Sequence, residues 1–220
     1  MNHWICVPVK PFEYGKSRLA ELLGEEERIK LNRALLEHIL ATIQQTHWTE
    51  NKIVISKGTE ALEIARNYGF FTITENPPYG LNRSIRKVLN SPFLKSATSI
   101  TIIPSDLVLV TKEELNELFT LRNEQDGLII VPDRRKEGTN VLSVMPPTAI
   151  SFQYGKYSFQ KHINSAKSDS VHVTVHESDW LGIDLDTESD LFDILTICPN
   201  IIDTIPELAC FHSVIQTKGV

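Results

Sequence analysis

The sequence predicts an α/β protein built around a mostly parallel central sheet with helices on both faces. Through the first 130 residues, short apolar runs rich in β-branched residues alternate with segments of helical periodicity. Such alternation is typical of a parallel sheet that is covered on both sides. Beyond about residue 140, strand-like runs follow one another with little helix between them, which predicts a small antiparallel extension. The 220 residues are enough for one domain with a full core.

Five runs read as buried strands because they are short, apolar and β-branched. They cover 4–9, 52–56, 70–74, 99–104 and 127–132. Four later runs are strand-like and would form the extension, at 140–146, 150–155, 171–176 and 180–186. Because neither a linker nor a repeat interrupts this pattern, we expect a single domain over 1–220. The poorly patterned residues 199–220 would be a C-terminal tail packed on it.

Helices are predicted at 25–45, 59–69, 81–89, 111–122 and 158–167. In the first, apolar residues recur at helical spacing over 29–43. Gly69 is a stop signal for the second helix. Thr111 is well placed as an N-cap before Glu113 and Glu114.

Composition excludes several classes of function. The formal net charge of −6 argues against a general nucleic-acid binder. The three cysteines, Cys6, Cys198 and Cys210, form no CxxC pair and are too scattered for a disulfide framework or a zinc site. We expect reduced thiols in a cytoplasm, since no secretory leader and no membrane-spanning run is seen in the sequence.

The stretch FEYGKSRLA (12–20) contains the Gly-Lys-Ser that ends a P-loop. A P-loop needs an earlier glycine so that the backbone can wrap the phosphates, and that position is Lys10. Lys10, Lys16 and Arg18 nevertheless put three cations on a loop after the first strand. Charged side chains of this kind can hold a polyphosphate. A solvated basic loop is the alternative interpretation.

Three aspartates fall where strands are predicted to end, which is where open α/β sheets collect their chemistry. Asp106 follows the run at 99–104, and Asp184 and Asp186 stand two apart at the end of the run at 180–186. In an extended backbone residues i and i+2 point to the same side, so both carboxylates could reach one divalent cation such as Mg²⁺. Asp186 could instead be a helix cap, a role equally open to Thr187.

Three glycine-containing turns could bind anions or a base. In Gly138-Thr139-Asn140 a flexible backbone, a hydroxyl and an amide suit a phosphate or carboxylate ligand, although a hairpin turn is the bland alternative. Gly155 allows close approach, and Ser158 stands where a helix begins, which is a natural anion site and also an ordinary helix start. Gly80 and Asn82 mark another helix start, where the amide could contact a base edge or only cap the helix.

Taken together, these segments resemble the 2-phospholactate guanylyltransferase family of coenzyme F-420 biosynthesis. The similarity runs in collinear order from about residue 4 to 195 through VPVKPFEYGKSRLA, GLNRSI, SDL, PDRRKEGTNVL, QYGKYSFQKHI and LGIDLDTESDL. The family is similar to the molybdenum-cofactor guanylyltransferases. The resemblance implies a Rossmann-like fold of the nucleotide-diphospho-sugar transferase type, with GTP as substrate and Mg²⁺ as cofactor.

The resemblance also implies a role for each matching residue. Lys10, Lys16 and Arg18 would bind the GTP triphosphate, and Gly80 and Asn82 would lie near the guanine. Asp106, Asp184 and Asp186 would hold magnesium and, with Lys16, form the catalytic set. Thr139, Gly155 and Ser158 would bind a phosphorylated three-carbon acid, which is 2-phospholactate, phosphoenolpyruvate or 3-phosphoglycerate. A homodimer is a family-level expectation.

One departure from the family is Val108, which stands where the family usually has proline after Asp-Leu. We expect the metal site to survive with an altered loop. Other interpretations stay open. The chain could transfer another nucleotide to a sugar phosphate or molybdopterin, or be a glycosyltransferase, since Asp184-Leu185-Asp186 also satisfies a DxD pattern. It could also be a non-catalytic nucleotide-binding module.

Overall fold

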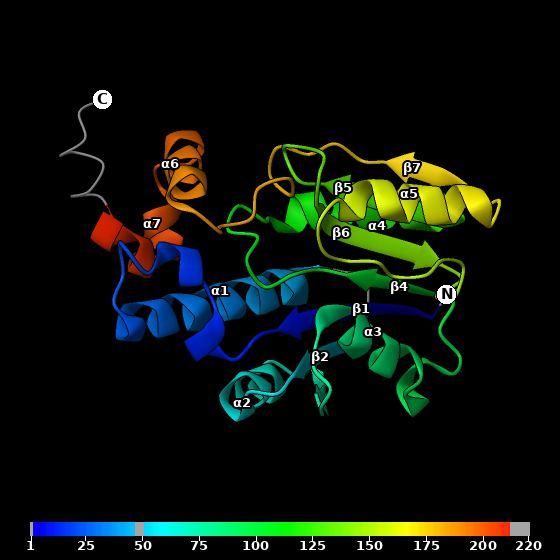
Figure 1. The fold of residues 1–220 in the computed structure, drawn as a ribbon, viewed down its shortest axis with the longest axis horizontal. Coiled ribbons are helices and arrows are strands. Elements are labelled where there is room, and N and C mark those ends of the chain that lie inside the picture. The colour runs from blue at the N-terminus through cyan, green and yellow to red at the C-terminus, as the bar shows by residue number, and fades with distance from the viewer. Residues whose placement is uncertain (1, 47–50, 212–220) are drawn as a thin grey trace.

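A mixed sheet runs through the centre of the protein, whose structure is a computed structural model that describes residues 2–46 and 51–211. In this described part, seven strands lie in the order β3-β2-β1-β4-β6-β5-β7 (Figure 1). Their bounds are His3–Val9 (β1), Lys52–Ser56 (β2), Phe71–Thr74 (β3), Ser99–Ile102 (β4), Gly127–Pro132 (β5), Thr139–Met145 (β6) and Val173–Val175 (β7). This arrangement confirms the α/β prediction.

The helices alternate with the strands as predicted. Their bounds are Glu25–Gln45 (α1), Thr59–Asn67 (α2), Leu81–Leu89 (α3), Lys112–Glu124 (α4), Ser158–Ser168 (α5), Glu188–Ile197 (α6) and Ile201–Thr204 (α7), with short 3₁₀ turns at Phe12–Tyr14 (η1), Ser17–Leu19 (η2), Pro92–Leu94 (η3) and Pro206–Phe211 (η4). Thr111 caps α4 as expected, because its side chain accepts a hydrogen bond from the Glu114 backbone N–H. Among the described residues, no helix is long and apolar enough to cross a membrane.

The direction of β6 decides which of its residues lie at the end of the sheet where the central strands β1 and β4 terminate. β6 runs antiparallel to both β4 and β5, whereas the other pairings, including that of β5 with β7, are parallel. Ile102 at the end of β4 pairs with Leu142. The first residue of β6, Thr139, therefore lies at the edge of the sheet where β1 and β4 end.

Two of the strand predictions are wrong. Residues 150–155 form no strand, and neither do residues 180–186, which follow an irregular path before α6. Both runs are apolar because they cover the core. Ile183 and Leu185 are buried against residues of α6, and Leu181 is buried in the core between the sheet and α1, α2 and α4. The alternation of these residues therefore reflects packing and not a place in the sheet.

Apolar residues on the two faces of the sheet make two core clusters. On one face, residues such as Ile5 and Val7 pack against α1, α2 and α4. On the other, Trp4 and Cys6 pack with α3 and α5. The strict alternation along β1 follows from the two-residue period of a strand.

A third cluster lies beyond the end of the sheet and packs against the loop that follows β1. It joins Leu19 of η2, Leu31 and Leu35 of α1, and residues of α6, α7 and η4, among them Ile201 and Phe211. Figure 1 shows α6 and α7 beyond the end of the sheet, next to the start of α1. The described part of the predicted tail therefore packs against the first loop. The single-domain assignment itself stays a prediction, and residues 212–220 lie outside the described residues.

Candidate active site

The first loop is held in place by α1. Asn32 of α1 donates a hydrogen bond from Nδ2 to the Phe12 carbonyl at 2.9 Å. Gly15 lies so close to that amide that a Cβ on it would come within 2.4–2.7 Å of Asn32 side-chain atoms. Lys16 then adopts a left-handed conformation with φ 53°. This backbone reversal points the buried Lys16 side chain toward the carboxylates that follow β4 and precede α6.

The segment before α6 presents two aspartates on one side. Ile183 and Leu185 are buried in the third cluster, so Asp184 and Asp186 point the other way. The Leu185 N–H donates to the Asp106 carbonyl at 3.1 Å, which fixes this segment beside the loop after β4. Buried apolar residues, and not a strand, thus produce the same-side arrangement.

Thr187, and not Asp186, caps α6. The Thr187 side chain accepts from the Asp190 N–H, and Asp190 Oδ2 in turn accepts from the backbone N–H groups of Asp186 and Thr187 at 3.1 and 2.7 Å. The Asp186 carboxylate is therefore available to the site. Val108, the departure from the family, is fully buried in the third cluster with Leu109.

The three aspartates converge. One carboxylate oxygen from each of Asp106, Asp184 and Asp186 lies within 4.8 Å of the others. Lys16 Nζ donates to Asp106 Oδ2 at 2.7 Å and to Asp186 Oδ1 at 3.3 Å. Arg18 approaches Asp186 Oδ2 at 3.6 Å from the solvent side. The predicted juxtaposition of the triad with the cationic loop is present.

Charge crowding changes the proton affinity of these groups. Burial, and then the carboxylates of Asp106 and Asp186, raise the pKa of Asp184 to about 7. Burial alone would lower the pKa of Lys16. The charges of Asp106 and Asp186, with the hydrogen bonds to them, outweigh this effect. The pKa of Lys16 is therefore raised, and its ammonium group stays charged. The cluster carries more negative charge than Lys16 neutralises.

These residues have the chemistry of a magnesium site. The ligand atoms are hard carboxylate oxygens from two separate segments. Burial, and then the neighbouring carboxylates of Asp106 and Asp186, raise the pKa of Asp184, and a divalent cation would offset the second of these causes. The donor set therefore suits Mg²⁺, although the metal itself stays a prediction.

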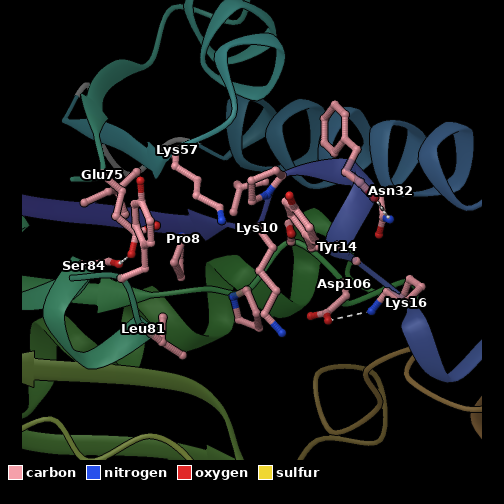
Figure 2. A pocket seen from close by; sticks show the side chains of 18 of the residues that line it. Pro8, Lys10, Tyr14, Lys16, Asn32, Lys57, Glu75, Leu81, Ser84 and Asp106 are labelled. Carbon is pink, nitrogen blue, oxygen red and sulfur yellow. Dashed lines mark hydrogen bonds and ion pairs between the residues drawn. The ribbon is translucent and has the colours of Figure 1, made fainter. Parts of the chain in front are cut away.

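A cavity of about 410 Å³ extends from this cluster along the edge of the sheet. Lys10, Lys16, Gly80, Asp106 and Asp186 all line it. Figure 2 shows Lys16 and Asp106 at one end, Lys10 in the middle, and Glu75 with Ser84 at the other end. A cavity of this size suits a small ligand, and here both of its ends are polar.

Glu75 was not singled out from the sequence. It directly follows β3, and its Oε1 accepts hydrogen bonds from the Gly80 N–H at 3.1 Å and from the Ser84 hydroxyl. The rule that identified Asp106, a carboxylate after a parallel strand, applies equally to Glu75. Lys57 follows β2 in the same way, and its ammonium lies 4.5 and 4.6 Å from the ring centroids of Tyr14 and Tyr79.

Asn82 has a different place from the one the resemblance implies. Its Nδ2 donates to the Tyr154 carbonyl at 3.0 Å, and its Oδ1 accepts from the Tyr154 N–H at 2.7 Å. Both ends of the amide thus hold the segment before α5, and Asn82 does not line the cavity in the described part of the chain. Its contact with guanine stays an untested prediction that the geometry does not favour.

The predicted acid-binding residues gather around the start of α5. Ser158 is buried as the first residue of α5, although Tyr157 occupies the N-cap position. Gly155 has φ 121°, a conformation that favours glycine. Thr139 Oγ1 lies 3.0 Å from Nδ1 of the buried His162. These residues do not line the 410 Å³ cavity, but β6 brings Thr139 to the same edge of the sheet.

Comparison with known proteins identifies the family of this chain. A model of the family described as guanylyl transferase CofC like matches residues 3–199. A 2-phospho-L-lactate guanylyltransferase of Methanobrevibacter smithii is 30% identical over 86% of this chain and 82% of its own length. A phosphoenolpyruvate guanylyltransferase of Sphaerobacter thermophilus is 31% identical over 88% of this chain and 92% of its own length.

Solved structures share the fold at lower identity. A protein of Desulfovibrio desulfuricans, assigned to the nucleotide-diphospho-sugar transferases, superposes with a TM-score of 0.79 at 16% identity, covering 98% of this chain and 97% of that one. The CMP:2-keto-3-deoxy-manno-octonic acid synthetase gives 0.62 at 9% identity, with 91% and 99% coverage. These confirm the Rossmann-like fold. The family match and the two relatives show that this chain is a nucleotidyltransferase and belongs to the CofC-like guanylyl transferase family.

Proposed function

We propose that this protein is a magnesium-dependent enzyme of coenzyme F-420 biosynthesis that transfers GMP from GTP to a phosphorylated three-carbon acid and releases pyrophosphate. The acid is 2-phospholactate, phosphoenolpyruvate or 3-phosphoglycerate. The observation that carries this proposal is the convergence of Asp106, Asp184 and Asp186 with Lys16 and Arg18 at one end of the cavity. The two curated relatives named above support the choice of nucleotide and of acid class.

The two ends of the cavity indicate how GTP would be oriented. Lys10, Lys16 and Arg18 would bind the triphosphate at the carboxylate end, where Mg²⁺ would be held by the three aspartates. The opposite end offers Glu75, whose two hydrogen bonds from residues in the described part of the chain both reach Oε1. Oε2 is then left for guanine, which presents two adjacent donors, N1–H and the 2-amino group. Adenine, cytosine and uracil lack that pair, so Glu75 would favour guanine.

The reaction needs no general base from the protein. A phosphate monoester loses its second proton with a pKa of about 6, so its oxygen is already a nucleophile near neutrality. That oxygen attacks the α-phosphorus of GTP. A new P–O bond forms, the bond to the β-phosphate oxygen breaks, and pyrophosphate leaves with the electron pair.

Lys16 and Arg18 reduce the repulsion between the dianionic acid and the triphosphate. The bound magnesium would supply further charge neutralisation at the phosphates. Lys16 is buried and already paired with Asp106, so its ammonium group would need to move little during the reaction. Positioning and electrostatics, and not proton transfer, would provide most of the rate enhancement.

Pyrophosphate release tests the proposal. The protein is incubated with Mg²⁺, GTP and each of the three acids in turn, and CTP, UTP and ATP are then tested in place of GTP. We expect release with GTP and at least one acid. Tight GTP binding without release for every acid would instead favour a non-catalytic nucleotide-binding module, and a preference for CTP would favour a different nucleotidyltransferase.

Glu75→Gln tests the orientation of the base. Glutamine keeps the oxygen that accepts from Gly80 and Ser84, but replaces the other oxygen with a donor that faces guanine's donors. We expect KM for GTP to rise about tenfold or more, with a smaller change in KM for the acid. Glu63→Gln on the exposed face of α2 is the control and should change neither value. An unchanged KM for GTP in Glu75→Gln would place the base elsewhere.

A further inference from the structure

His162 of α5 lies fully buried beneath Thr139, with both ring nitrogens in hydrogen bonds. Nδ1 lies 3.0 Å from Thr139 Oγ1, and Nε2 accepts a hydrogen bond from the Gln153 backbone N–H at 2.9 Å. The edge of the ring packs against Tyr154, with centroids 5.0 Å apart.

The backbone contact determines which nitrogen carries the proton. A peptide N–H can only donate, so Nε2 must present its lone pair to Gln153. The proton of the neutral ring is then on Nδ1. Burial, together with the neighbouring charge of Lys161, lowers the pKa of His162 to about 4, so the ring is neutral near pH 7. Nδ1–H therefore donates to Thr139 Oγ1.

This assignment fixes the direction of the Thr139 hydroxyl. Oγ1 accepts from the imidazole, so its own hydrogen must point toward another acceptor. Within residues 2–46 and 51–211, His162 is the hydrogen-bond partner of Thr139 Oγ1, and no protein acceptor takes the hydroxyl proton. The half-buried hydroxyl thus presents a donor at the edge of the sheet where β1 and β4 also end.

We propose that His162 is a positioning residue that fixes the Thr139 hydroxyl as a hydrogen-bond donor to an oxygen of the phosphorylated acid. The inference rests on the proposed function for the identity of that acid. Gln153 sets the tautomer of His162, and the Asn82 amide holds the adjoining Tyr154 backbone from α3. A fixed donor at this place pairs with a hydrogen-bond acceptor, and it binds a charged acceptor such as a phosphate dianion more strongly than a neutral one.

A double-mutant cycle tests whether His162 acts through Thr139. His162→Leu removes the donor and should raise KM for phosphoenolpyruvate about tenfold, with less than about a twofold change in KM for GTP. His162→Asn restores a donor near the position of Nδ1 and should recover most of the loss. In a Thr139→Val background, His162→Leu should add little, because the hydroxyl it positions is already absent.

His3→Leu is the matched control. His3 is also a buried imidazole whose pKa is lowered to about 4, but it lies at the start of β1, at the opposite edge of the sheet. The His3→Leu variant should be less stable than the wild-type protein but should have an unchanged KM for the acid. An unchanged KM in His162→Leu, or full additivity with Thr139→Val, would overturn the inference.

A second measurement does not depend on the variants folding or on turnover. A long-range ¹H–¹⁵N spectrum of the wild-type protein should show His162 as the Nδ1–H tautomer at pH 7. The Nε2–H tautomer or a charged ring would contradict the inference directly. If the wild-type protein releases no pyrophosphate with any acid, the proposed function fails, whereas calorimetric binding of phosphoenolpyruvate to the same variants still decides the role of His162.

Discussion

Replacing Lys16 with methionine should destabilise the protein far more than removing an exposed lysine from an ion pair of equal length. Lys16 Nζ lies 2.7 Å from Asp106 with only 5% of its side chain exposed. Lys136 Nζ also lies 2.7 Å from its partner, Glu177, but 54% of its side chain is exposed. Lys136→Met therefore provides a control that matches the distance and differs in burial.

The expected magnitude follows from burial. Breaking a buried ion pair costs about 3–5 kcal/mol when the remaining charge stays buried. Here Asp106 and Asp186 keep 27% and 46% of their side chains exposed, so water recovers part of the loss. We expect Lys16→Met to cost about 2 kcal/mol and Lys136→Met less than about 0.5 kcal/mol.

Urea unfolding in the presence of EDTA measures both losses, provided that the slope of free energy against urea is unchanged. Adding Mg²⁺ should restore more stability to Lys16→Met than to the wild-type protein, since the cation would neutralise the carboxylates that the lysine no longer faces. Equal losses for the two variants would refute the view that Lys16 compensates a crowded acidic cluster.

Three further predictions concern stability and local geometry. Burial lowers the pKa of His3 and of His162 from 6.5 to about 4. Each residue therefore contributes stability of about 3 kcal/mol that is present above pH 6.5 and is lost as the pH falls toward 4. His162→Leu should flatten the dependence of the unfolding free energy on pH, and an unaltered slope would contradict this. Thr187→Ala removes the cap of α6 and should cost about 1 kcal/mol in urea unfolding, whereas no loss would mean that Asp190 alone suffices. Gly15→Ala brings a Cβ against Asn32 and should raise KM for GTP, and Asn32→Ala should partly relieve the effect, while strictly additive changes would argue against that contact.

The fold was predictable from the sequence wherever one local pattern determined the structure. The amphipathic period of α1 and the β-branched runs of β2 and β5 gave elements at the predicted bounds. The errors at 150–155 and 180–186 have a common cause. An irregular segment that covers a core face alternates apolar and polar residues in the same way as a strand, and its hydrogen bonds are determined by distant parts of the chain.

The site was predictable from the sequence only where a local pattern placed its residues. The position of Asp106 after a strand and the spacing of Asp184 and Asp186 anticipated their convergence. Glu75 directly follows β3 and so obeys the same rule, but its role depends on the hydrogen bonds from Gly80 and Ser84, which are 5 and 9 positions further along the chain. The pairing of Asn82 with Tyr154 and of His162 with Thr139 joins residues that are 72 and 23 positions apart, which no local pattern reveals.

The central claim is that Asp106, Asp184 and Asp186 together hold a divalent cation beside the GTP triphosphate. Titration of Mn²⁺ as a magnesium substitute, followed by electron paramagnetic resonance in the presence of a non-hydrolysable GTP analogue, measures this directly. We predict tight Mn²⁺ binding by the wild-type protein, weakened at least about tenfold in Asp184→Asn and unchanged in the surface control Asp203→Asn. Equal Mn²⁺ affinity in the wild-type protein and Asp184→Asn would contradict the account.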